Sequence, residues 1–164
     1  MTEPDLSVCL PVTPTPKGRP RAFKVGRGVR MRTPEKTRAA EHLVATYFRA
    51  YMRRSRLRPL EGSLRVRIVA VWPRLKATPK KTPGRIYKAT KPDADNVAKL
   101  ILDSLNGIAF GDDGQVVELH VEKWHAALGE DPCVEVRIWR VVDIEADSCT
   151  MKNGRKHGTQ PTEH

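Results

Sequence analysis

The chain has no apolar run long enough to cross a membrane. Its first residues, MTEPDLSVCLPV, also lack the basic start and the long apolar segment of a secretory signal. Membrane-bound and secreted proteins are therefore not expected. The sequence predicts a protein that stays in the cytoplasm.

Cysteine is scarce as well. Cys9, Cys133 and Cys149 are odd in number, far apart and without a C-x-x-C pair. This pattern argues against a disulfide framework and against a zinc site. Cys9 and Cys133 are predicted to be small strand residues in a reducing compartment.

Acidic residues are few in the first part of the chain. Residues 1–91 hold 23 Lys and Arg against 5 Asp and Glu, whereas residues 92–164 hold 7 against 14. The formal net charge of +11 therefore combines a strongly basic part with an acidic one. A basic part of this size favours a polyanionic partner, because neutralised phosphates release counterions and long-range attraction speeds encounter. A merely soluble basic surface is the alternative.

At 164 residues the chain is long enough for one hydrophobic core and too short for two. Apolar content falls sharply near the end, so we expect one domain over residues 1–142 and a polar, disordered tail over residues 143–164. Within the domain, the expected order is strand, possible hairpin, helix, strand, helix, strand, strand. This order predicts an α/β (α+β) fold in which two main helices pack on one face of a mixed sheet.

Hydrophobic periodicity and turn residues give the expected bounds. The predicted strands and hairpin are Ser7–Val12, Phe23–Val25 with Val29–Arg32, Leu64–Trp72, Gln115–Trp124 and Cys133–Val142. The last two strands are joined by a turn containing Gly129, and we expect them to pair as a hairpin. His120 and His125 lie in or beside these strands without metal-ligand spacing, so both are predicted to be surface or hydrogen-bonded histidines.

Thr33 is the expected N-cap of the first helix and Pro34 its first helical residue. One apolar face is predicted from Ala40, Leu43, Val44, Tyr47, Phe48 and Tyr51. Since Tyr47 and Phe48 fall on this stripe, a core position is favoured for them over stacking on bases.

The most informative stretch is Lys91 to Asp113, KPDADNVAKLILDSLNGIAFGDD. A helix is predicted to start after Pro92 and to end at Gly107. Most of it is apolar, and one narrow polar edge follows three- and four-residue spacing. That edge comprises Asp95, Asn96, Lys99, Asp103 and Asn106.

Two interpretations of this stretch stay open. Asp93 could be a simple N-cap, Asp95 a favourable charge on the helix dipole, and Asp95 with Lys99 a surface ion pair. A second acidic pair, Asp112 and Asp113, follows the helix closely, and this spacing allows the two pairs to meet. Clustered carboxylates repel unless a cation neutralises them, and such oxygen ligands suit Mg²⁺ or Mn²⁺.

Two basic segments precede the acidic stretch. Residues 14–21 form a stiff turn in which Lys17, Arg19 and Arg21 are predicted phosphate contacts; a basic loop without a partner is the alternative. Residues 74–91 are predicted to be a mobile loop that closes on DNA, and an ordinary solvated charge run is the alternative. The basic residues of this loop are Lys76, Lys80, Lys81, Arg85, Lys88 and Lys91.

The order K-P-D-x-D-N-x-x-K, an apolar helix reaching D-x-L-N-G, and then D-D-x-Q-V-V with a strand resembles the RusA-type Holliday-junction resolvases, which are common in phages and prophages. The resemblance runs from about Leu6 to Val142 and includes P-x-P-K-G-R-P-R at Pro14 to Arg21. It implies a homodimeric, Mg²⁺-dependent endonuclease that cuts four-way junctions in a bacterial or phage-infected cell.

The resemblance also implies roles for single residues. Asp93, Asp95 and Asp113 would be the catalytic metal ligands, and Lys99 would also be required. Asp112 would be an outer or alternate ligand. A nuclease for forks or flaps, and a non-catalytic nucleic-acid-binding module, remain alternatives to a junction resolvase.

Overall fold

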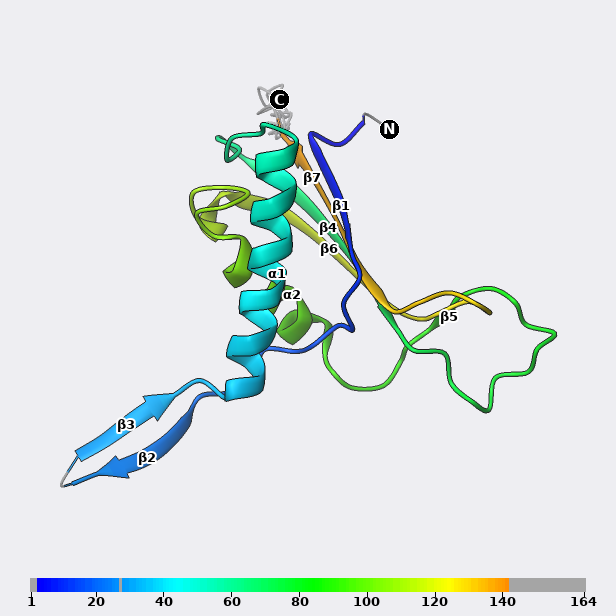
Figure 1. The fold of residues 1–164 in the computed structure, drawn as a ribbon, viewed down its shortest axis with the longest axis horizontal. Coiled ribbons are helices and arrows are strands. Elements are labelled where there is room, and N and C mark those ends of the chain that lie inside the picture. The colour runs from blue at the N-terminus through cyan, green and yellow to red at the C-terminus, as the bar shows by residue number, and fades with distance from the viewer. Residues whose placement is uncertain (1–2, 27, 142–164) are drawn as a thin grey trace, which may run out of the picture.

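The computed structural model describes residues 3–26 and 28–141 (Figure 1). It contains a five-stranded mixed sheet, a separate two-stranded hairpin and two helices. The elements in chain order are β1 Leu6–Leu10, β2 Arg21–Val25, β3 Gly28–Arg32, α1 Glu35–Arg54, β4 Leu64–Trp72, β5 Ile86–Tyr87, α2 Ala94–Leu105, the short 3₁₀ helix η1 Asp113–Gln115, β6 Val116–His125 and β7 Cys133–Arg140.

The strand order in the large sheet is β1-β7-β4-β6-β5. Only β4 and β6 run parallel; the other neighbours are antiparallel. Both helices lie on the same face of this sheet, and the β2–β3 hairpin projects away from it (Figure 1). The predicted mixed sheet with two helices on one face is therefore confirmed.

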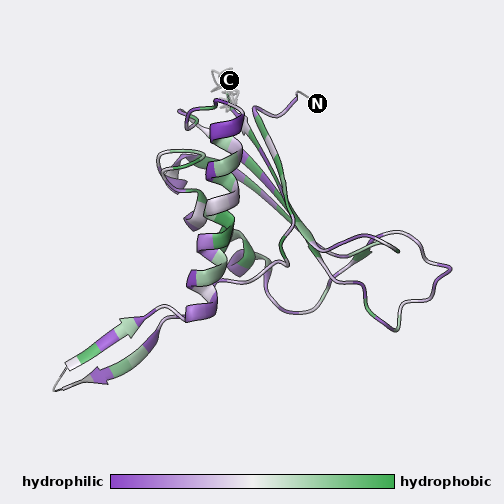
Figure 2. Cartoon of the chain, viewed as in Figure 1, coloured by the Kyte–Doolittle hydropathy of each residue, from purple (hydrophilic) through white to green (hydrophobic). Residues whose placement is uncertain are grey.

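Alternating side chains place the core between the helices and this face. Leu6, Val66 and Ile138 point toward the helices and meet Phe48 of α1 and Ile101 of α2 in one buried cluster. Apolar and polar residues alternate along α1 and the central strands, as an element with one buried face requires (Figure 2). A smaller cluster covers the opposite face at the end of β4, which explains why this strand is buried on both sides there.

The predicted pairing of β6 with β7 is wrong. Both strands flank β4, which pairs with β6 in parallel and with β7 antiparallel. The connection containing Gly129 passes over the end of β4, where the Ala126 amide donates to the Trp72 carbonyl at 2.8 Å. The two strands are thus antiparallel, as expected, but the central strand separates them.

The start and the apolar face of α1 also differ from expectation. Pro34, with ψ of 142°, is the N-cap, and the helix begins at Glu35 without a side-chain cap from Thr33. An extended ψ lies outside the helical region, so Pro34 is not the first helical residue. Leu43 and Tyr47 remain 46% and 39% exposed, because the core contacts the neighbouring stripe of Val44, Phe48 and Met52.

The first strand is shorter than predicted, ending at Leu10. In the hairpin, β2 begins two residues earlier and β3 one residue earlier than expected. Gly107, with φ of 69°, follows α2 in the left-handed conformation that the sequence predicted. No described helix combines the length and apolarity that a membrane crossing needs. The tail of residues 143–164, predicted to be disordered, lies outside the described residues.

Candidate functional site

Two exposed carboxylates stand at the start of α2. Asp93 is the N-cap residue, with extended backbone at φ −71° and ψ 149°, yet its side chain makes no capping hydrogen bond. Asp95 is in the first turn, and the adjacent Asn96 side-chain amide donates to its carboxylate at 3.4 Å. The helix therefore does not use Asp93 as a side-chain cap, although both charges are favourable beside the helix N-terminus.

Lys99 follows Asp95 by one helical turn and is exposed. Among the ion pairs of the described residues, none joins Asp95 to Lys99. The surface ion pair considered from the sequence is thus not formed. Three charged side chains at this end of α2 remain available to a ligand.

The two residues of the second acidic pair, Asp112 and Asp113, have different environments. The Asp112 carboxylate accepts a hydrogen bond from the Gly114 amide at 2.8 Å and completes a capping box with Gln115 around η1. Gln115 in turn donates to the carbonyls of Leu60 and Gly62, which tie this turn to the segment before β4. Asp113 is exposed and has no such bond. Asp112 therefore stabilises the turn, whereas Asp113 is free to act elsewhere.

The two acidic groups lie at opposite ends of α2. Asp93 precedes the helix and Asp95 lies in its first turn, whereas η1 follows the other end of the helix (Figure 1). Twelve helical residues span about 18 Å. Within the described part of the chain, no group of three or more His, Cys, Asp or Glu side chains is placed to hold a metal ion. The sequence allowed the two pairs to meet, but within one described chain α2 separates them.

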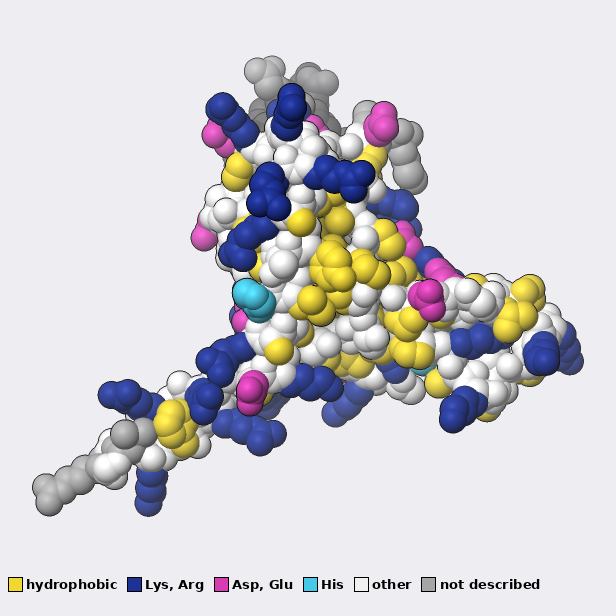
Figure 3. Space-filling model, viewed as in Figure 1, with side chains coloured by type: hydrophobic (Ala, Val, Ile, Leu, Met, Phe, Trp, Pro, Cys, Tyr) yellow, Lys and Arg dark blue, Asp and Glu magenta, His cyan; other side chains and the backbone are white. Residues whose placement is uncertain are grey.

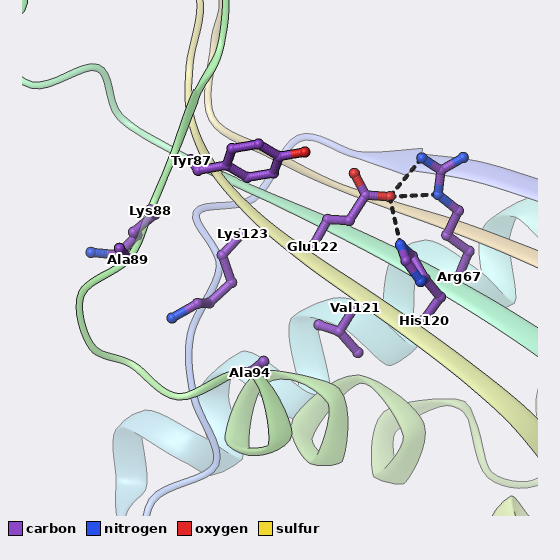
Figure 4. Close-up of a pocket in the computed structure, with 9 residues that line it drawn as sticks. All are labelled: Arg67, Tyr87, Lys88, Ala89, Ala94, His120, Val121, Glu122 and Lys123. Atoms are coloured by element: carbon purple, nitrogen blue, oxygen red, sulfur yellow. Dashed lines mark hydrogen bonds and ion pairs between the residues drawn. The ribbon is translucent and has the colours of Figure 1, made fainter.

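The start of α2 borders a hollow of about 580 Å³ between the β5 segment and β6 (Figure 4). Ala94, between the two aspartates, forms part of its wall. The other lining residues are Arg67, Tyr87, Lys88, Ala89, His120, Val121, Glu122 and Lys123. The Lys123 ammonium donates to the Thr90 and Pro92 carbonyls at 2.9 and 2.7 Å and so holds the entry to α2 against β6.

Charged and aromatic contacts shape this hollow. The Glu122 carboxylate accepts a hydrogen bond from the Arg67 guanidinium and lies 3.2 Å from the His120 ring (Figure 4). Burial acts to raise the pKa of Glu122, but hydrogen bonds from Arg67 and Trp124 outweigh it and hold that pKa below its usual value. Tyr87 stacks on Trp124 with ring centroids 3.7 Å apart and is 70% exposed.

Sequence reasoning missed Tyr87 and Glu122, which line the hollow beside the acidic helix start, and Trp124, on which Tyr87 stacks. The short β5 strand that carries Tyr87 gives no periodic signal, and its pairing with β6 brings together residues far apart in sequence. The histidine predictions are confirmed. His120 is exposed beside Glu122, and buried His125 lies 3.1 Å from the Pro73 carbonyl.

Two of the residues predicted to contact DNA form ion pairs with acidic side chains of the protein itself. Lys17 forms ion pairs with Glu41 of α1 and Asp103 of α2. Burial acts to lower the pKa of Lys17, but hydrogen bonds to Asp103 and Glu41 reverse this and raise it. Arg85 is held by Glu130 and Glu135, and the hydrogen bond to Glu130 is the main cause of its raised pKa. Through these ion pairs, Lys17 holds the segment of residues 14–21 against α1 and α2, and Arg85 holds the loop of residues 74–91 against Glu130 and Glu135.

The other predicted contacts are accessible. Lys88 is half-buried, with its ammonium 2.7 Å from the Thr90 hydroxyl and 5.5 Å from the Trp72 ring. The remaining ones are exposed: Arg19, Arg21, Lys76, Lys80, Lys81 and Lys91. Basic side chains cover the β2–β3 hairpin, line part of α1 and cover the loop that carries β5 (Figure 3). All residues of β3 are exposed, as expected of an arm that does not contribute to the core.

A basic α/β molecule with free carboxylates at a helix start has the features of a nucleic-acid-processing protein. Residues 11–139 match the family described as Endodeoxyribonuclease RusA. The chain therefore belongs to the RusA endodeoxyribonuclease family. It is also 34% identical over 140 residues to "Uncharacterized protein YqaN" of Bacillus subtilis (strain 168), a match that covers 78% of this chain and 91% of the relative.

Proposed function

We propose that the protein is a Mg²⁺-dependent endodeoxyribonuclease that resolves four-way (Holliday) junctions by paired nicks during DNA recombination and repair. It acts as a homodimer in the cytoplasm of a bacterial or phage-infected cell. One observation carries this proposal: Asp93, Asp95 and Lys99 are all exposed at the start of α2. Among the described residues, Asp93 makes no capping hydrogen bond and Asp95 forms no ion pair with Lys99. Family membership supports the same activity.

The carboxylates suit the proposed ion in type but not in arrangement. Asp93, Asp95 and Asp113 offer the oxygen ligands that Mg²⁺ prefers, with Mn²⁺ as a possible substitute. In one chain, however, α2 separates Asp113 from the other two, and Asp112 caps η1. The residues of a single described chain therefore do not fit the complete ligand set, and a second chain is needed to supply the missing part.

The chain's own residues account for binding and positioning. The basic hairpin and the loop of residues 74–91 project from the body in different directions, where both can contact phosphates (Figure 1). Lys99 lies on the exposed edge of α2, where its ammonium can neutralise charge on a phosphate beside Asp95.

A labelled four-way junction, incubated with protein and either Mg²⁺ or EDTA, tests the proposal. We expect symmetric nicks with Mg²⁺ and none with EDTA. Asp95→Asn should abolish cleavage while junction binding stays equal or becomes tighter, because the change removes a carboxylate that repels phosphate. Asn preserves the size of the side chain, and Asp95 makes no cap bond, so the fold should persist.

Substrate comparison separates the alternatives. Faster cleavage of a fork or a flap than of a junction would assign the same chemistry to another substrate. Tight DNA binding without Mg²⁺-dependent cleavage of any of these DNAs would instead support a non-catalytic binding module.

A further inference from the structure

Tyr87 is a large aromatic side chain that contributes little to the core. It is 70% exposed and belongs to β5, a strand of only two residues. A single exposed aromatic residue is common on protein surfaces and needs no explanation. Two features distinguish Tyr87 from such a residue: the contacts that hold its ring, and its position beside the start of α2.

A chain of contacts holds the ring of Tyr87. One face stacks on Trp124, with ring centroids 3.7 Å apart and an interplanar angle of 25°. The Trp124 indole donates a hydrogen bond to the Glu122 carboxylate at 3.1 Å, and this carboxylate also accepts one from Arg67 at 2.7 Å. Trp124 packs in addition on the buried cluster at the end of β4. Tyr87 therefore rests on a fixed partner, while most of its own surface stays open to solvent.

This aromatic pair stands at the acidic end of α2. Tyr87 lines the same hollow of about 580 Å³ as Ala94, which lies between Asp93 and Asp95 (Figure 4). Lys88, the residue after Tyr87, also lines it and adds positive charge. Sites for small ligands usually measure about 300 to 1,000 Å³, so the hollow has room for one nucleotide. An exposed ring, a cation and the helix start with its two carboxylates thus border one space.

We propose that the open face of Tyr87 stacks on one unpaired nucleobase of the DNA strand whose phosphate is bound at the start of α2. The inference rests on the proposed function and deepens it, because it names a residue that recognises branched DNA. Stacking on an aromatic ring tolerates every base, since each base has a π face. Tyr87 therefore selects the structure of the DNA and not its sequence.

A linear duplex cannot make this contact without opening. Neighbouring base pairs cover both faces of each base, and taking a base out of the stack costs unstacking and unpairing energy. That cost is smaller where a base is already poorly stacked, as at the branch point of a junction, where strands leave one duplex for another. The contact consequently favours branched DNA, whereas the basic side chains attract branched and linear DNA alike.

Binding in EDTA tests the contact without requiring cleavage. Tyr87→Leu removes the ring but keeps an apolar side chain against Trp124, so its circular dichroism spectrum should not change. Its dissociation constant for a four-way junction should rise on the order of tenfold, the effect of losing one base–aromatic stack, with no change for a linear duplex. The salt dependence should stay the same, because no phosphate contact is lost. Tyr87→Phe, which retains a ring, should bind the junction like the wild type.

Tyr47→Leu is the matched control, because Tyr47 is also an exposed tyrosine, at 39%, but belongs to α1 and does not line the hollow. It should keep the junction affinity of the wild type. Equal losses for Tyr47→Leu and Tyr87→Leu would overturn the inference. A Tyr87→Leu protein that binds junctions as tightly as the wild type, or that loses as much affinity for the linear duplex, would overturn it as well.

Photo-cross-linking gives a direct readout on the unaltered protein. Junctions carry iodouracil at single positions around the branch point, and mass spectrometry identifies the residue that each position attaches to in light. We expect a cross-link to Tyr87 from a position at the branch point and none from the linear duplex; cross-links confined to other residues would refute the contact. A protein that cross-links at Tyr87 but leaves junctions intact with Mg²⁺ would contradict the proposed function and retain the stacking contact. Cleavage without this cross-link would do the reverse.

Discussion

At the scale of single residues, Asp93 is informative because it occupies a capping position without capping. An N-cap aspartate usually accepts a hydrogen bond from the amides of the first turn, which contributes about 1 kcal/mol. Here the side chain makes no such bond, whereas Asp112 makes one at η1. The sequence alone could not separate these two aspartates, because both precede a turn of helix. Their hydrogen bonds assign a structural role to one and leave the other free.

Lys99 gives the residue-scale prediction. Lys99→Ala should lower the cleavage rate at saturating junction by on the order of 100-fold, the usual effect of removing one group that stabilises developing charge. Affinity should change little, because many other basic residues supply phosphate attraction. Single-turnover rates and dissociation constants measure the two effects separately.

Lys76→Ala is the control for this experiment, since Lys76 is exposed on the basic loop away from α2. It should weaken binding and reduce the salt slope by about 1 without changing the rate at saturation. If Lys99→Ala behaved in the same way, Lys99 would be an ordinary phosphate contact.

At the scale of elements, the loop of residues 74–91 has contacts that its sequence did not predict. Its basic and proline-rich composition predicted a mobile segment, yet Arg74 donates to the carbonyls of Pro79 and Thr82, and Arg85 pairs with Glu130 and Glu135. These glutamates follow Arg85 by 45 and 50 residues. Local composition carries no information about such distant partners, so the anchoring of this loop could not be predicted.

Glu130→Gln tests this anchor. A hydrogen bond from Arg85 is the main cause that holds the pKa of Glu130 below its ordinary value of 4.5. A lowered folded-state pKa means that Glu130 stabilises the fold above about pH 4.5, and that this contribution disappears as the pH falls through the folded-state value. The variant should therefore lose about 1 kcal/mol of unfolding free energy at pH 7 and a smaller amount at pH 3.

Urea unfolding at the two pH values measures this difference. Glu61→Gln is the control, because Glu61 is exposed and the structure gives it no ion pair. A loss for Glu130→Gln that is equally large at pH 3 would indicate a packing defect and would exclude the ion pair as its cause.

Element positions were easier to predict than their pairing. The bounds of β4 agree with the alternation of its side chains, and α2 ends before Gly107 as expected. The β6–β7 hairpin was wrong because a short connection between antiparallel strands usually joins neighbours, and only the buried β4 between them shows otherwise. Likewise, spacing predicted that Asp113 follows α2 closely, but not that the helix directs it away from Asp93.

At the scale of the whole molecule, this separation and the proposed homodimer lead to a prediction about two chains. If a complete site takes Asp93 and Asp95 from one chain and Asp113 from the other, two inactive variants should complement each other. In a dimer of one Asp95→Asn chain and one Asp113→Asn chain, both changes fall in the same site. The second site then has all of its carboxylates.

Purified heterodimers of these two variants should therefore nick one strand of a junction extruded from a supercoiled plasmid and give open circles. Each homodimer should be inactive, because each has one defect in both sites. If all three aspartates of a site came from the same chain, both sites of the heterodimer would be defective and the plasmid would remain supercoiled. Differently tagged chains allow the heterodimer to be isolated, and wild-type protein, which should give linear product, calibrates complete resolution.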